Sequence, residues 1–149
     1  FVLAGPSAVE FNRWTWPENV HFLGSVSHKE LPQLMASATA GIIPFDVQNK
    51  MDLIQGIRPL KLLEYMAAGL PVVCARWPEV ENMHSPAFLY ADGQECVELI
   101  EQVVAGRYLS RECSNFAQTN DWSQAFEIML EAIQIATQET QAHGEQFFN

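Results

Sequence analysis

Residues 59–73 read Pro-Leu-Lys-Leu-Leu-Glu-Tyr-Met-Ala-Ala-Gly-Leu-Pro-Val-Val, which predicts a short helix followed directly by an apolar strand. Leu60, Leu63, Ala67 and Leu70 recur at three- and four-residue spacing, as on a packed face. Lys61 and Glu64 lie three residues apart on a different face. One face can therefore pack in a core while the other reaches a ligand.

The start of this helix favours an anion. Pro59 suits the first helical position, but Arg58 is a poor N-cap because its side chain offers no oxygen to the backbone N–H groups. Arg58 and Lys61 add positive charge where the helix dipole is already positive, at a cost of roughly 0.3 to 1 kcal/mol. A bound phosphate or carboxylate would reverse that cost. A plain surface ion pair between Lys61 and Glu64 is the alternative, and the residues alone leave both open.

The composition is that of an ordinary soluble globular domain. The 149 residues are 48% hydrophobic and 17% charged, enough for one core. A net charge of −10 argues against a nucleic-acid surface, since phosphate contacts need clustered Lys and Arg. Three widely spaced cysteines predict neither a disulfide framework nor a zinc site and fit a reducing cytosol. We expect neither a membrane span nor a signal peptide.

Apolar runs alternate along the chain with helix-start patterns, such as Asp92 followed three residues later by Glu95, which indicates an α/β fold. Because the strands are apolar throughout, we expect one parallel sheet covered on both faces, with ligands at the carboxyl ends of its strands. The expected strands are residues 1–5, 20–23, 40–45, 71–75 and 87–90. The expected helices are residues 27–38, the one that starts at residue 59, and 92–106, 108–118 and 122 onward, with irregular connections at 46–58 and 76–86.

Four segments, taken in order, resemble the C-terminal donor-binding domain of GT-B glycosyltransferases of the group 1, family 4-like kind. They are residues 19–24 (Asn-Val-His-Phe-Leu-Gly), 30–32 (Glu-Leu-Pro), 43–45 (Ile-Pro-Phe) and 59–73. The resemblance implies a three-layer, Rossmann-like parallel sheet, one half of a GT-B fold. That domain would span residues 1–149 and include terminal helices at about 107–142. It further implies that the first strand of the sheet and an acceptor-binding domain precede Phe1, so the chain alone would have trouble folding.

The same resemblance implies a donor nucleotide-sugar site in this domain. Glu64 would hold the ribose hydroxyls, and Lys61 would approach the diphosphate. Arg58 and Pro59 join the site through the helix-start argument given above.

Two further candidates follow the strand at residues 40–45. Pro44 and Phe45 lie beside the 46–58 connection and could line the pocket for the base, although core packing of Phe45 is an equal alternative.

Gly56 departs from the family pattern, because retaining members have an acidic residue eight positions before the one at Glu64. The stereochemical outcome therefore stays open, and we assign no catalytic residue in this chain. No Asp-x-Asp pair is present to hold a metal, so we expect a metal-independent reaction without a cofactor. The helix N–H groups, Lys61 and Arg58 would then stabilise the departing diphosphate.

The leading hypothesis is the donor domain of an enzyme that transfers a sugar from UDP or GDP to an acceptor in polysaccharide or glycoconjugate synthesis. The acceptor, a glycan, lipid or protein, would bind the preceding domain, and the fragment is not expected to be active alone. We expect a cytoplasmic protein, with membrane contact at the inner face made through that absent domain. Two alternatives stay open: a non-catalytic scaffold that lost the acidic residue at position 56, and a nucleotide-sugar epimerase of the same fold.

Overall fold

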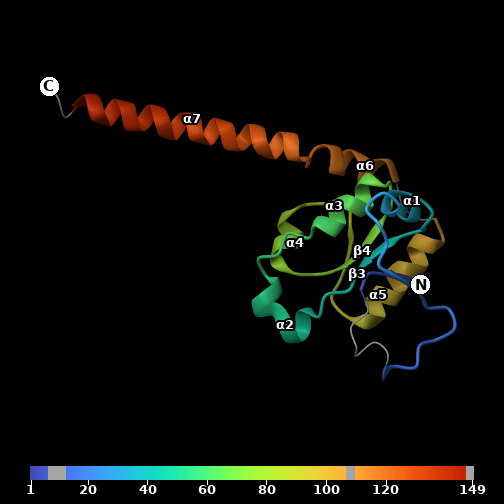
Figure 1. Cartoon of the computed structure of the whole chain (residues 1–149). Coiled ribbons are helices and arrows are strands. Elements are labelled where there is room, and N and C mark those ends of the chain that lie inside the picture. Colours follow the sequence, from blue (N-terminus) through green and yellow to red (C-terminus); the bar gives the residue numbers. More distant parts are fainter. Residues whose placement is uncertain (7–12, 107–109, 147–149) are drawn as a thin grey trace. The chain divides into compact units, whose positions relative to one another are not determined.

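A computed structural model of the chain describes residues 1–6, 13–106 and 110–146 (Figure 1). The chain divides into two compact units, Phe1–Ala38 and Thr39–Asn149. Each unit is an α/β structure with parallel strands, so the expected fold class is confirmed. The expected single sheet is seen as two sheets, one in each unit.

In its described residues, 1–6 and 13–38, the first unit contains a two-stranded parallel sheet and one helix. Strand β1 (Val2–Ala4) pairs with β2 (His21–Gly24), with Val2 opposite His21. Every residue of both strands is exposed. Helix α1 (Leu31–Ala36) follows, within the residues expected to be helical.

The second unit contains the hydrophobic core around a three-stranded parallel sheet. The strands are β3 (Gly41–Ile43), β4 (Val72–Ala75) and β5 (Phe88–Tyr90), with β4 in the centre. All four residues of β4 are buried, as expected for a strand with neighbours on every side. Helix α3 (Leu60–Ala67) packs against β3 and β4, and α5 (Gly93–Val104) packs against β4 and β5.

A glycine allows α3 to lie close to β3. A Cβ atom added at Gly41 would fall 2.3 Å from Cδ2 of Tyr65, far inside van der Waals contact. Leu62 and Met66 of the same helix are fully buried. The sequence pattern assigned the packed face to Leu60, Leu63, Ala67 and Leu70, but Leu60 and Ala67 are exposed, and the helix packs instead through Leu62 and Met66. Lys61 and Glu64 are exposed, as expected.

Two short helices occupy stretches that the sequence pattern indicated as irregular. In the 46–58 connection, α2 (Val47–Ile54) begins at Asp46, whose Oδ1 accepts a hydrogen bond from the Asn49 backbone N–H at 3.3 Å. Non-helical backbone angles at Lys50 interrupt α2, which hides its periodicity in the sequence. In the 76–86 connection, α4 (Pro78–Asn82) follows β4. The irregular assignment of both connections was therefore wrong in part.

Two helices end the described chain. Helix α6 (Ser110–Gln118) packs against α3, and α7 (Trp122–Gln146) is a single long helix (Figure 1). Side chains from Trp122 to residue 138 are all exposed. No helix in the described part of the chain combines the length and hydrophobicity of a transmembrane segment.

Candidate functional site

The expected site lies in the second unit, where β3 ends and α3 begins. Pro44 and Phe45 directly follow β3, so they lie at the carboxyl end of a parallel strand, where ligands usually bind. Both residues are exposed. The Phe45 side chain is 37% exposed. Its ring stacks on Trp77, with centroids 5.2 Å apart and an interplanar angle of 26°. Phe45 thus packs on the core with part of its ring and leaves the rest accessible.

Pro59 precedes α3 as its N-cap and not as its first helical residue. Its backbone angles, φ −77° and ψ 108°, are extended, and the helix begins at Leu60. The N-cap contributes no side-chain hydrogen bond, as expected from the absence of a capping side chain. Because Pro59 is buried, it shapes the start of the helix and does not present a contact surface.

Lys61 and Glu64 form an ion pair on the exposed face of α3. Lys61 Nζ lies 2.5 Å from Glu64 Oε2, and the two side chains are 54% and 44% exposed. This is the surface pair that the sequence left as an alternative reading. Exposed pairs of this kind contribute only about 0.3 to 0.5 kcal/mol, so a bound anion and a hydroxyl group could separate the two side chains at little cost.

Arg58 has a neutral partner. Its Nη2 donates to Oδ1 of Asn120 at 3.0 Å, while Nδ2 of Asn120 donates to the Phe116 carbonyl at 3.0 Å. Asn120 therefore links helix α6 to Arg58, two residues before α3 begins. Within the described ranges, Arg58 forms no ion pair with a carboxylate, whereas Lys61 and Arg76 do. At the start of α3, the charge of Arg58 is therefore less compensated than that of Lys61.

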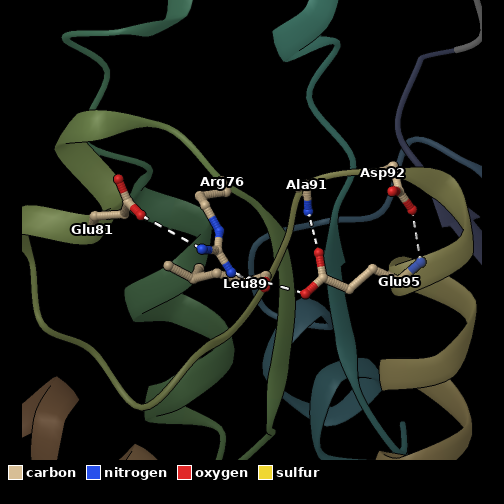
Figure 2. Close-up of polar contacts among 6 residues, drawn as sticks. All are labelled: Arg76, Glu81, Leu89, Ala91, Asp92 and Glu95. Atoms are coloured by element: carbon tan, nitrogen blue, oxygen red, sulfur yellow. Dashed lines mark hydrogen bonds and ion pairs between the residues drawn. The ribbon is translucent and has the colours of Figure 1, made fainter.

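Arg76, directly after β4, is fixed by contacts on two sides (Figure 2). Its guanidinium nitrogens lie 3.9 Å from Oε1 of Glu81 in α4 and 3.9 Å from Oε1 of Glu95 in α5. Nη2 also donates to the Leu89 carbonyl at 3.0 Å. Two carboxylates offset the Arg76 charge, so this arginine is a poor candidate for a phosphate ligand. Its contacts instead connect the residue after β4 with α4 and α5.

Glu95 also belongs to the cap of α5. Its Oε2 accepts from the Ala91 backbone N–H at 2.7 Å, while its own N–H donates to Oδ1 of Asp92 at 2.9 Å (Figure 2). The sequence predicted this start of the helix from the Asp92 and Glu95 spacing. It did not predict the contact with Arg76, because nothing local in the sequence relates the two residues.

Trp77 is a second residue that the sequence reasoning missed. Its side chain is 1% exposed, and its indole Nε1 donates to the Ile57 carbonyl at 2.9 Å. Ile57 directly precedes Arg58. The same indole ring stacks on Phe45, so one buried side chain contacts both segments that contain candidate residues.

Comparison with known proteins shows the family of this chain. Residues 1–105 match the family model described as glycosyl transferases group 1. The chain belongs to this glycosyltransferase family. It is also 32% identical over 137 residues to the protein named "Putative teichuronic acid biosynthesis glycosyltransferase TuaH" of Bacillus subtilis (strain 168). That alignment covers 85% of this chain and 34% of the relative, so the chain spans about a third of the length of the relative that it matches.

The family match includes all six candidate residues of this glycosyltransferase domain and also Arg76 and Trp77. Helices α6 and α7 and the Arg58 partner Asn120 lie beyond it. The structure pairs Lys61 with Glu64 on the exposed face of α3, while Pro59 is buried and Arg58 bonds to Asn120. Phe45 joins them through Trp77, which contacts Phe45 and the segment before α3.

Two titratable groups with large pKa shifts lie in the core of the glycosyltransferase domain. Burial raises the pKa of the Cys74 thiol to about 12, and burial also raises the pKa of Tyr90. Neither group has the shift of a catalytic acid or base near neutral pH. No group of three or more His, Cys, Asp and Glu side chains in the described part of the chain is placed to hold a metal ion.

Proposed function

We propose that this domain binds a nucleoside-diphosphate sugar, linked to UDP or GDP, for transfer of the sugar to an acceptor. The diphosphate lies at the start of α3 beside Lys61 and Arg58, and Glu64 accepts hydrogen bonds from the ribose hydroxyls. The base lies against Pro44 and the accessible part of Phe45. The observation that best supports this is the exposed Lys61 and Glu64 pair next to a helix start without a side-chain cap.

The chemistry needs positive charge near the leaving group. As the bond between the anomeric carbon and the diphosphate oxygen breaks, the sugar acquires oxocarbenium character and the diphosphate gains negative charge. The α3 N–H groups, Lys61 and Arg58 stabilise that charge without a metal. The acceptor oxygen then bonds to the anomeric carbon, and its proton passes to the departing diphosphate or to a base of the preceding domain. In our proposal, the groups that hold the acceptor belong to a preceding domain.

The relative supports a role in polysaccharide or glycoconjugate synthesis. TuaH is named for teichuronic acid biosynthesis, and the sequence similarity extends over most of this chain. The acceptor of the present protein, a glycan, lipid or protein, is not assigned by that name.

The test uses the full-length protein. Because Lys61 faces the departing diphosphate, Lys61→Ala should lower turnover by about 10²-fold, the lower end for loss of one transition-state donor. Glu64→Ala should weaken binding of UDP or GDP in a calorimetric titration. Matched controls are Lys50→Ala and Glu101→Ala, which remove the same charges from exposed positions elsewhere in the second unit. Wild-type turnover and affinity in both site variants would contradict the proposal.

The non-catalytic alternative is motivated by Gly56. This glycine is exposed, and a Cβ atom added there would meet nothing within 4 Å, so an acidic side chain would fit the space. A scaffold that has lost this residue should show no saturable UDP or GDP binding. The same calorimetric titration of the wild-type protein therefore separates the two functions.

A further inference from the structure

Trp77 lies between the two segments of the proposed site. On one side its ring stacks on Phe45, which follows β3. On the other side its Nε1 donates to the carbonyl of Ile57, one residue before Arg58. Phe45 and Ile57 are separated in the chain by helix α2, so Trp77 provides a direct link that the backbone does not.

The backbone around Trp77 is itself well fixed. The Arg76 N–H donates to the Tyr90 carbonyl at 2.9 Å, and the Arg76 guanidinium contacts α4 and α5 (Figure 2). Trp77 is then the N-cap residue of α4, followed by Pro78 in the first turn. A side chain that is 1% exposed on such a fixed backbone has little freedom to move.

Both partners of the indole are less constrained than Trp77. Phe45 and Ile57 lie outside helices and strands, and their side chains are 37% and 40% exposed. The buried Trp77 side chain therefore restrains two more exposed groups, the Phe45 ring and the Ile57 carbonyl. The Ile57 carbonyl has no partner in a helix or sheet ladder, because it lies between α2 and α3.

We propose that Trp77 is a positioning residue that holds the Phe45 ring and the start of α3 at one fixed spacing for a nucleotide. This inference rests on the proposed donor site. The base and the diphosphate of one nucleotide are joined by a ribose of fixed size, so their two binding segments must keep a matching separation. Small displacements of such groups reduce binding and turnover strongly.

The test is Trp77→Phe in the full-length protein, titrated with UDP and with GDP. Phenylalanine retains an aromatic ring for the stack and removes the N–H that bonds to Ile57. We expect an affinity about 10-fold weaker for the nucleotide that the wild type binds, the equivalent of one net hydrogen bond. The matched control is Trp14→Phe, at a 69% exposed position of the first unit. This control should leave the affinity for the nucleotide unchanged.

A double-mutant cycle separates positioning from a general loss of structure. If Trp77 acts through the start of α3, adding Trp77→Phe to Arg58→Ala should change the affinity less than 2-fold, because the positioned group is already gone. A full 10-fold effect in both backgrounds, or no effect in either, would overturn the inference. If Trp77→Phe does not fold, the cycle is made between Phe45→Leu and Arg58→Ala. Additive effects of those two changes would overturn it equally.

The outcomes also distinguish this inference from the function on which it rests. A wild type that binds neither UDP nor GDP contradicts the donor site and the Trp77 role together. A wild type that binds, with Trp77→Phe binding equally well, contradicts the Trp77 role alone.

Discussion

Strands β4 and β2 have the same length and similar apolar sequences, but they differ in burial. All residues of β4, Val72 to Ala75, are 0% exposed, whereas Phe22 and Leu23 of β2 are 43% and 48% exposed. Strand β4 has a neighbour on each side and contacts α3 and α5, while β2 pairs with β1 in a two-stranded sheet. An apolar run therefore predicts a strand, and the elements packed around it determine its burial.

The comparison matters for the site. All six candidate residues lie in the unit with the buried sheet, and Trp77, which follows β4 closely, contacts Phe45 and the Ile57 carbonyl. A binding site needs groups held by packed neighbours, which the unit around β4 supplies.

The largest expected effect comes from truncating one buried leucine. Leu62→Ala on α3, at 0% exposure, should lower the free energy of unfolding by about 2 to 5 kcal/mol because it leaves a cavity next to β4. Leu23→Ala on β2 removes the same atoms from an exposed position and should change it by less than about 1 kcal/mol. Urea unfolding of the full-length protein measures both. Equal losses of unfolding free energy in the two variants would contradict the difference in burial between α3 and β2.

A second prediction concerns the close approach of α3 to β3. Gly41→Ala adds a methyl group 2.3 Å from the Tyr65 ring and should destabilise the chain by about 1 to 3 kcal/mol through overpacking. Gly93→Ala is the matched control. That glycine begins α5, nothing lies within 4 Å of its added Cβ, and alanine there should stabilise by roughly 0.5 kcal/mol. Thermal unfolding of both variants should give shifts of opposite sign, and a tolerated Gly41→Ala would contradict the packing.

A third prediction uses the one ionisable side chain of β4. Burial raises the pKa of Cys74 from 9.0 to about 12, so between these values the unfolded thiol loses its proton while the folded thiol keeps it. Stability from this group is complete below pH 9 and is lost as pH rises toward 12, by at most about 1.4 kcal/mol per pH unit. Cys74→Ala should reduce the slope of unfolding free energy against pH in this range. An unchanged slope would mean that Cys74 is not buried.

Much of the fold could be predicted from local pattern. The apolar runs predicted all five strands, and the Asp92 and Glu95 spacing predicted the start of α5. Helix α2 was missed because it is short and Lys50 interrupts its geometry. The exposure of β1 and β2 was missed because burial depends on neighbours distant in the sequence.

The same limit applies to the site. Lys61 and Glu64 could be recognised because they lie within one turn of one helix and within a family motif. The contacts of Trp77 with Phe45 and Ile57, and of Arg58 with Asn120, join residues far apart in the chain. No spacing rule predicts such pairs, since the fold alone brings them together.

The proposed ribose contact of Glu64 provides the most direct test of the donor site. In the full-length protein, calorimetry should give an affinity for UDP or GDP about 10-fold higher than for its 2′,3′-dideoxy form, the equivalent of one net hydrogen bond. Glu64→Ala should bind the two forms equally, while Glu101→Ala keeps the wild-type preference. A preference that survives Glu64→Ala, or a wild type that binds no nucleoside diphosphate, would contradict the account.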